Sequence, residues 1–600
     1  MLFKEKYINR IKKLEDEKAN CKKQYNIISI LRLLSILWVM YFVYYFIQES
    51  PTKFAVVTSI LAIILFMYLL NLHNSIKTKL RKYDCMIDIN KKYIKRLEGD
   101  WIEFKDNGKE ELSLDHPYGN DLDIFGEKSL FQFINTTNTF YGRKKLVNSL
   151  KHPEKDINKI TKRQKAIKEL GSNIEICNRL ECEGMASNKR AGEASDLTKE
   201  AKDISSLFKG NIMKIISYIL PICLILSTIV IISLNLIRYM YIPLMIFTLN
   251  LILTFISYSK ITPVLDSAYS IKKDIEVYSS ILSVIEENDF ESEYLKELKE
   301  KLTLKGTPSH VIIKKLNKIV DKINLKYSML YLVINILFLW QYHCLFSIEN
   351  WKKRYGKFSL DCFDTVGEFE SLSSLAVLLH LNPDWQFPSL EKEGVKVTAR
   401  KLGHPLIDGR KRIRNNVDMT NSIFIVTGSN MSGKTTFLRT IGINLVLAYA
   451  GAPVCANSMS CSIMDILTSM RISDDLNEGL STFYAELKRI KIIIDNLNNK
   501  RPMIFLIDEI FKGTNSKDRI IGAENVVRNL DKKFAIGAIS THDFELCDLE
   551  SNDKNRIKNY HFSESYKNDE IYFDYKLKKG RSDTTNAKYL MKMVGIKIVE

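Results

Sequence analysis

The sequence predicts an α-helical first part that carries two membrane hairpins, followed by an α/β second part with a parallel sheet. Two pairs of long apolar stretches predict the hairpins. From about residue 386 the pattern changes to strands alternating with helices, which is typical of a parallel sheet. A glycine-rich octet, GSNMSGKT at 428–435, lies between an apolar strand and a helix in this second part.

The charge balance favours a partner rich in phosphate or a membrane surface. The 600 residues include 88 Lys+Arg and 70 Asp+Glu, a formal net charge of +18. This excess suits nucleic acid, an anionic lipid surface, or a membrane protein with basic cytoplasmic flanks. The ten cysteines form no CxxC pair, which predicts reduced thiols in a cytosolic setting and argues against a zinc site.

The first predicted hairpin consists of two apolar helices, at about residues 28–47 and 54–72. A spanning helix needs about 20 largely apolar residues, and 33–47 is apolar except for Ser35. Arg32 stands at the inner end, where a long side chain can reach the lipid headgroups.

The second predicted hairpin consists of about 215–236 and 239–258, joined around Arg238. Basic residues are dense before and after the first hairpin. The short connections between the two helices of each hairpin contain only Lys53 and Arg238. The positive-inside rule therefore places both chain ends and the central segment in the cytoplasm. Buried core helices of a soluble protein are the alternative interpretation of both hairpins.

A fifth apolar stretch, 327–346, contains Asn335, Gln341 and His343, which are costly in hydrocarbon. One further crossing would also place the octet outside the cell, away from ATP. We therefore expect this stretch to be a cytosolic core helix, although the sequence does not decide whether it enters the membrane.

The octet fits the pattern G-x-x-x-x-G-K-[ST] and predicts a nucleotide phosphate site. Backbone N–H groups of such a loop wrap the phosphates, and the following helix adds its positive dipole end. Lys434 is expected to reach the β- and γ-phosphates, and the Thr435 hydroxyl is expected to bind Mg²⁺. The predicted nucleotide-binding residues are Gly428, Ser429, Asn430, Met431, Ser432, Gly433, Lys434, Thr435 and Thr436.

Two later strands supply the candidate catalytic groups. RPMIFLIDEI (501–510) ends in Asp508, placed to hold Mg²⁺, and Glu509, placed to polarise the attacking water. A purely structural alternative for this acid pair is a place in the first turn of a helix, where acidic side chains are favoured. FAIGAIS (534–540) leads to His542, which can contact the γ-phosphate.

These segments resemble the MutS mismatch-repair ATPases, within the wider ABC-type ATPases. TGSNMSGKTTFLR resembles their phosphate loop, DEIFKGTNSKD their Mg²⁺ and catalytic strand, and STHDFEL their histidine switch. LSTFYAELKRI (480–490) resembles their signature segment, and GHPLI (403–407) the entry to their ATPase domain. GEFESLSSLA, FINTTNTFYGRKKLVNSL and RQKAIKEL resemble the helical core and lever that precede it, so the resemblance covers roughly 119–600.

The resemblance implies three regions. Residues 1–118 are expected to form the N-terminal hairpin with basic flanks, and 119–385 a helical lever and core region that contains the second hairpin. Residues 386–600 are expected to form an α/β ABC-type P-loop ATPase domain. The family's sites form between two subunits, so a homodimer binding ATP and Mg²⁺ is implied. Ser481 and Thr482 would face the γ-phosphate held by the other subunit, and Asn430 matches the loop's family asparagine.

The sequence also departs from the family. The first 118 residues hold a hairpin where the family has its mismatch-reading and connector domains, and we locate no DNA clamp. Phe511 and Lys512 stand where the family usually has Gly and Arg, which leaves the hydrolytic residues intact. Arg412 falls near the position of the aromatic that commonly stacks on adenine, and arginine can also stack.

The sequence thus predicts a membrane-anchored, MutS-like, dimeric ATPase that couples ATP hydrolysis to DNA binding. Its expected location is a bacterial-type inner membrane, which it crosses several times, with the ATPase domain in the cytoplasm. The alternatives are an ABC-type transport ATPase and a membrane-organising ATPase without DNA binding. Only four spans and the signature LSTFYAEL, instead of a Gly-Gly-Gln type, argue against transport.

Overall fold

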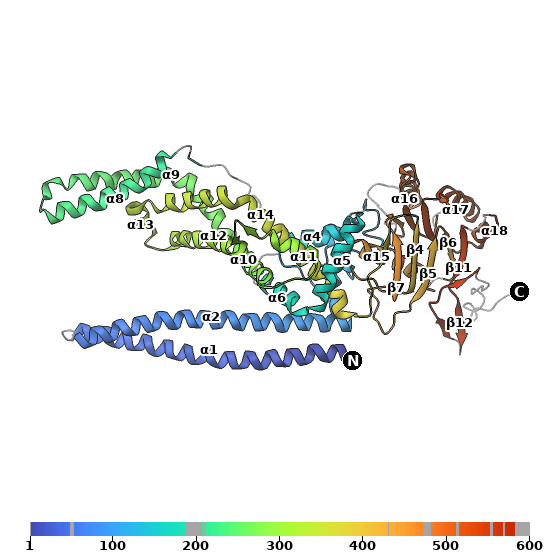
Figure 1. Ribbon diagram of the computed structural model, residues 1–600, viewed down its shortest axis with the longest axis horizontal. Coiled ribbons are helices and arrows are strands. Elements are labelled where there is room, and N and C mark those ends of the chain that lie inside the picture. The colour runs from blue at the N-terminus through green and yellow to red at the C-terminus, as the bar shows by residue number, and fades with distance from the viewer. Residues whose placement is uncertain are drawn as a thin grey trace.

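The computed structural model describes residues 2–48, 53–113, 115–185, 207–208, 211–429, 431–471, 482–511, 515–552, 556–567 and 570–581. The molecule is elongated, with two helical hairpins that extend toward one end and a β-rich domain at the other (Figure 1). A helical body lies between them (Figure 1). The fold therefore separates its two most apolar sequence regions from its phosphate loop along the longest axis of the molecule.

The first hairpin is built from two long, uninterrupted helices, α1 (Leu2–Gln48) and α2 (Lys53–Glu98). Each measures about 70 Å at 1.5 Å per residue, so the basic flanks continue the apolar helices as a paired stalk. Lys4 bonds Glu98 at 2.6 Å and Lys18 bonds Asp84 at 2.5 Å, which fixes the antiparallel register.

The stalk base docks on the helical body through an aromatic cluster. The rings of Tyr7 (α1) and Tyr93 (α2) stack with centroids 5.0 Å apart. The Tyr7 hydroxyl donates to the His380 carbonyl at 3.3 Å, and the Tyr93 hydroxyl lies 3.1 Å from His380 Nδ1. Arg96 donates to the carbonyl of Phe133 at 2.7 Å. All of these side chains are buried, so the stalk is part of the folded body.

The second hairpin consists of α8 (Ile212–Ser233) and α9 (Tyr241–Ser270), linked by the 3-10 turn η3 (Ile237–Tyr239). The sequence predicted the second span to end near 258, but α9 continues to Ser270 and enters the body. In the described part of the chain, four helices are long and apolar enough to cross a membrane: α1, α2, α8, and η3 together with α9.

The body is centred on α14 (Trp340–Leu381), which packs against α4 and α5. A Cβ on Gly367 would lie 2.7 Å from the Tyr141 carbonyl oxygen, so glycine permits the close approach of α14 and α4. The other elements are η1 (Asp100–Glu103), η2 (Lys109–Glu111), α3 (Leu130–Ile134), α4 (Phe140–Lys151), α5 (Ile157–Ser172), α6 (Ile174–Gly184), α10 (Lys272–Glu287), α11 (Glu293–Glu300), β1 (Thr303–Leu304), β2 (Thr307–Pro308), α12 (Ser309–Ile323) and η4 (Asn324–Tyr327).

The stretch 327–346 is not the single core helix that the sequence suggested. It forms α13 (Tyr331–Phe338) and the first turns of α14, bent by 77° at Leu339. Leu339 adopts a left-handed conformation with φ 50°, a break that contains neither Gly nor Pro. Leu332, Val333 and Phe338 of α13 are exposed and only Ile336 is buried among its apolar side chains, so the expectation of a core helix is wrong for the outer face of this element.

Between residues 423 and 540 the β-rich domain confirms the predicted alternation of strands and helices, whereas the three strands before residue 423 follow one another without a helix. Its main sheet has the order β14-β11-β6-β10-β9-β8, parallel except for β14 at one edge. A second sheet has the order β3-β7-β4-β5. The strands are β3 (Ser389–Glu391), β4 (Lys396–Leu402), β5 (Asn415–Thr420), β6 (Ile423–Thr427), β7 (Ser458–Ser462), β8 (Asp465–Ser469), β9 (Met503–Asp508), β10 (Ala535–Ser540), β11 (Ile557–His561), β12 (Glu564–Lys567), β13 (Glu570–Phe573) and β14 (Lys578–Lys579).

The helices of this domain are α15 (Lys434–Tyr449), α16 (Thr482–Asn496), α17 (Ser516–Leu530) and α18 (Leu549–Asn552), with η5 (Leu497–Asn499) and η6 (Phe544–Asp548). Strands β6, β9 and β10 are buried along their whole length. Because they are parallel, their carboxyl ends meet at one edge of the sheet, which is where ligands of such sheets bind.

Candidate functional site

The glycine-rich loop leaves the end of β6 and turns directly into α15. Gly428 and Gly433 have φ of 145° and 104°, conformations that glycine adopts without strain. A Cβ on Gly428 would lie 2.8 Å from the Phe562 carbonyl oxygen and 2.9 Å from Ser432 Oγ, so only glycine fits there. Asn430 lies outside the described residues.

Lys434 turns back into the loop from the first position of α15. Its Nζ donates to the carbonyl oxygens of Gly428 at 2.8 Å and Ser429 at 3.0 Å. The side chain is 4% exposed, so the loop carbonyls hold the ammonium group at a fixed place at the helix N-terminus.

Thr435 and Asp508 meet as the sequence predicted. Thr435 Oγ1 donates to Asp508 Oδ2 at 2.7 Å, and the Ser540 hydroxyl bonds the other carboxylate oxygen. A hydroxyl beside a carboxylate is a set of hard oxygen ligands, which suits Mg²⁺. Asp508 and Ser540 are the last residues of β9 and β10, and Thr435 is the second residue of α15, which the loop connects to the end of β6.

Glu509 and His542 complete the same edge of the sheet. Glu509 has φ 52°, and its backbone N–H donates to Ser540 at the end of β10. His542 Nε2 lies 3.2 Å from Glu509 Oε1 and 3.3 Å from Lys434 Nζ. An acid, an imidazole and an ammonium group thus converge on the mouth of the glycine-rich loop.

The residues present fit a bound nucleoside triphosphate and Mg²⁺. The Ser432 hydroxyl oxygen is buried and has no hydrogen-bond partner among the described residues, so it is available to a phosphate oxygen. Ser429 Oγ, in contrast, donates to Glu564 Oε2 at 2.6 Å. Met431, with φ 70°, and Thr436 complete the described part of the predicted phosphate-binding segment.

A pocket of about 400 Å³ opens beside the loop. Gly433, Thr436 and Phe437 form one wall, and His404 and Ile413 form another. Phe562 and Tyr575 also line the pocket. Asn415 donates to the Tyr575 carbonyl at 3.0 Å and accepts from Leu577 N at 3.0 Å, which holds that segment over the pocket. The aromatic walls and the size suit a planar heterocyclic base.

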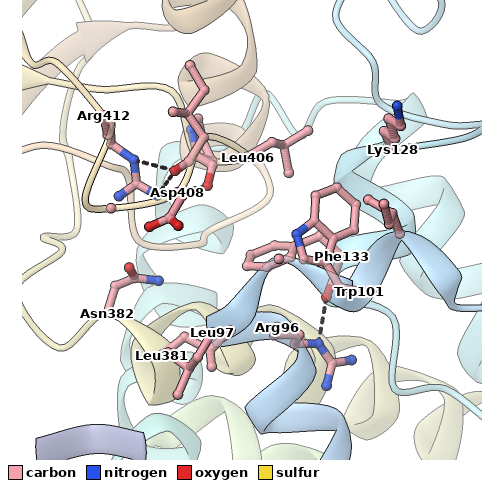
Figure 2. A pocket seen from close by; sticks show the side chains of 15 residues that line it. Arg96, Leu97, Trp101, Lys128, Phe133, Leu381, Asn382, Leu406, Asp408 and Arg412 are labelled. Atoms are coloured by element: carbon pink, nitrogen blue, oxygen red, sulfur yellow. Dashed lines mark hydrogen bonds between the residues drawn. The ribbon is translucent and has the colours of Figure 1, made fainter. Parts of the chain in front are cut away.

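Arg412 does not line this pocket, so its placement against a nucleotide base is wrong. Its guanidinium donates to the carbonyl of Ile407 at 3.0 Å and lies over the ring of Trp385. It borders a separate pocket of about 320 Å³ between the end of α2, η1 and the 405–412 loop (Figure 2). Sequence position alone placed it near the base, but backbone carbonyls on its own loop turn it the other way.

The predicted signature segment is only partly described. Ser481 lies outside the described residues, and Thr482 begins α16. In the same helix, the buried Glu486 accepts a hydrogen bond from Phe511 N at 2.5 Å, which links α16 to the segment after Glu509. Lys512 lies outside the described residues.

Sequence reasoning missed several residues of the site, namely Glu486, Ser540, Glu564 and Tyr575. Ser540 and Glu486 carried a signal: the first precedes the predicted switch histidine, and the second is an acid inside the predicted signature segment. Glu564 and Tyr575 are more than 130 residues from the loop in sequence, and no local pattern marks them.

A parallel sheet that presents a glycine-rich loop, a Thr–Asp pair and a Glu–His pair at one edge defines a P-loop nucleotide-binding domain. Two family models match the chain: MutS domain III over residues 110–326 and MutS domain V over residues 424–598. The chain belongs to the MutS family.

Curated relatives agree with this assignment. The DNA mismatch repair protein MutS of Aquifex pyrophilus is 32% identical over 239 residues, which are 38% of this chain and 27% of that protein. Its counterpart in Clostridioides difficile is 31% identical over 238 residues, 38% of this chain and 25% of that protein. MutS protein homolog 4 of Homo sapiens is 30% identical over 311 residues, 49% of this chain and 31% of that protein. The match thus spans about a third or less of each relative.

Proposed function

We propose that this chain is a membrane-anchored MutS-family ATPase that binds and hydrolyses ATP and couples hydrolysis to DNA binding. One observation carries the proposal: Lys434, the Thr435–Asp508 pair and the Glu509–His542 pair lie together at the carboxyl edge of the sheet.

Each group has a separate task in this mechanism. The Gly428–Gly433 loop and Lys434 bind the β- and γ-phosphates, and Thr435 and Asp508 would hold Mg²⁺, which would offset the negative charge of the phosphates. Glu509 orients and deprotonates the attacking water. His542, which lies between Glu509 and Lys434, contacts the γ-phosphate and responds to its loss.

A second copy of the chain completes the site. Met431 at the tip of the loop is exposed and can contact a second copy. Ser481 and Thr482 of one copy would reach the γ-phosphate held by the other, and ATP binding would clamp the two domains together.

DNA is the proposed macromolecular target. The relatives in Aquifex pyrophilus and Clostridioides difficile are named as DNA mismatch repair proteins, and the net charge of +18 suits a polyphosphate partner. The observations favour this over a transport ATPase, because MutS domain III and V models match the chain.

The two hairpins are the proposed anchors, in a bacterial-type inner membrane. Both extend toward the same end of the molecule, with the ATPase domain at the opposite end, so both can enter one bilayer (Figure 1). Their apolar side chains are exposed along most of their length, as for Leu61 and Leu226. By the positive-inside rule, the basic flanks support a cytoplasmic location of the ATPase domain.

The test is ATP hydrolysis by the full chain in lipid vesicles, with no DNA and with homoduplex, mismatched or branched DNA. We expect hydrolysis in every case and stimulation by at least one DNA, with an affinity that falls steeply as salt increases. Hydrolysis without any DNA effect would remove the DNA part of the proposal. Absence of ATP binding would remove all of it.

A further inference from the structure

The polarity of the segment around α13 is inverted relative to a protein surface in water. The outward-facing side chains are apolar: Val333 is 54% exposed, and Met329, Leu330, Leu332 and Phe338 are also exposed. The polar side chains face inward instead, since Asn335 is 1% exposed and Gln341 is 0% exposed. A contiguous exposed apolar patch over a buried polar layer indicates a lipid-facing element.

At the break between α13 and α14, Asn335 bonds backbone N–H groups on both sides, which lowers the cost of a turn in hydrocarbon. The Asn335 carbonyl accepts from Leu339 N at 2.8 Å and closes α13. Its side-chain Oδ1 accepts from Gln341 N at 2.9 Å and caps the start of α14. One buried asparagine thus serves both helix ends, at a corner where Leu339 is fully buried.

The corner is hydrogen-bonded to the polar side of α9. Gln341 Nε2 donates to the Thr254 carbonyl at 3.1 Å and to Ser257 Oγ at 2.8 Å. The Tyr342 hydroxyl donates to the Leu253 carbonyl at 3.3 Å. α13 also contacts α8, and it lies beside the α8–α9 hairpin, short of its tip (Figure 1).

The depth of the corner follows from its position along α9. Asp266, further down α9, bonds Lys326 at 2.5 Å and the Tyr327 hydroxyl at 3.1 Å, and the exposed Lys260 stands between Asp266 and Ser257, so these charged groups belong on the headgroup side of the corner. Ser257 lies nine residues from Asp266, about 14 Å at the rise of an α-helix. The exposed Lys260 is only three residues from Ser257, about 4.5 Å along the helix, so the corner lies just inside the hydrocarbon layer.

From this geometry we infer that residues 327–346 form a re-entrant membrane element whose exposed face contacts lipid acyl chains. α13 enters the hydrocarbon layer beside α8 and α9, and α14 returns to the same side. The inference rests on the proposed anchoring of the second hairpin. It also removes the parity problem of a fifth apolar stretch, because an element that returns leaves the ATPase domain on the cytoplasmic side.

The test is spin labelling of the full chain reconstituted in lipid vesicles. Cys85 and Cys223, the two cysteines that are not buried, are first replaced by serine. Single cysteines are then introduced by Val333→Cys, Phe338→Cys and Asn350→Cys and carry the label. Accessibility of each label to oxygen, which enters lipid, and to a water-soluble nickel chelate is measured.

We expect the labels at 333 and 338 to be open to oxygen and closed to nickel, with 338 the deeper. The label at 350, nine residues after Gln341, should be open to nickel. Nickel access at 333 would place the face in water and overturn the inference. Loss of access to both reagents would mean that protein, such as a second copy, covers the face, and depth that keeps increasing toward 350 would mean a full crossing. Either result would also overturn it.

Two further labels separate failure of this inference from failure of the anchoring proposal. Ile229→Cys places a label on the exposed face of α8, and Asp289→Cys places one on the water-exposed body. If 229 is lipid-facing and 333 is in water, only the re-entrant element is wrong. If both 229 and 333 match the label at 289, the hairpin is not in the bilayer at all.

Discussion

The two ends of this molecule place their apolar side chains in opposite positions. In the ATPase domain, Ile423, Phe424, Ile425 and Val426 of β6 are all 0% exposed, and polar groups gather at the strand ends. In the α8–α9 hairpin, apolar side chains cover the outside, and Asn250 and Thr254 are buried. The ATPase domain buries its apolar side chains in its own hydrophobic core, whereas the apolar surface of the hairpins must be covered by the surrounding medium, which we propose to be lipid. Changes at one end should therefore leave the other intact.

The largest effect is expected from Glu509→Gln. The amide keeps the size of the side chain but cannot take a proton from water, so hydrolysis should fall about 10²- to 10⁴-fold while ATP binding persists. Single-turnover hydrolysis and equilibrium binding of a labelled nucleotide measure the two separately. A variant that still hydrolyses ATP at the original rate would contradict the assignment of Glu509.

Lys434→Ala should come next. Removal of the ammonium group held by the Gly428 and Ser429 carbonyls should weaken catalysis about 10²- to 10³-fold and also impair nucleotide binding. Nucleotide binding at fixed Mg²⁺ is the measurement, and Lys533→Ala, an exposed lysine before β10, is the matched control. Membrane association should not change in either variant, since the two ends are independent.

Charges introduced into the hairpins should weaken membrane association and leave nucleotide binding unchanged. An aspartate at the centre of a spanning helix costs about 2.5–3.5 kcal/mol of insertion free energy. The double variant Leu61→Asp, Leu226→Asp should therefore be extracted from membranes by alkaline carbonate, while ATP binding is retained. Aspartates at the exposed Ile102 and Ile521, outside the hairpins, form the control pair. Extraction of the control as well would break the comparison.

The smallest effect is expected at His380, which lies where the stalk base contacts the helical body. Burial lowers the pKa of His380 from 6.5 to about 4, although a hydrogen bond to the Leu170 carbonyl acts in the opposite direction and raises it. The folded state therefore disfavours the charged imidazole, so this contribution is fully present above the unfolded pKa of 6.5 and is lost as pH falls toward 4. At about pH 5.5 the loss should be about 1 kcal/mol in the free energy of unfolding. Urea unfolding against pH measures it, and His380→Gln should flatten this part of the profile.

The sequence predicted those features that local patterns encode. Length and hydropathy located the hairpins, and the loop pattern located Lys434, Thr435 and their partners after β9 and β10. The continuity of the basic flanks with the hairpins was not predicted, because it depends on pairing of α1 with α2, as in the Tyr7–Tyr93 stack. The bend at Leu339 was missed because neither Gly nor Pro marks it; instead a local side-chain contact from Asn335 caps the start of α14. The pocket beside the loop was missed because Phe562 and Tyr575, which line it, lie more than a hundred residues after the loop in sequence.

The uninterrupted α1–α2 stalk has one more consequence. About 26 residues of α1 precede its apolar stretch, which corresponds to about 40 Å of rigid helix. On the proposed anchoring, the paired stalk acts as a spacer of fixed height, and the enzyme diffuses laterally in a thin layer beneath the membrane. Encounters with any target would then occur in two dimensions, limited to whatever passes within reach of that layer.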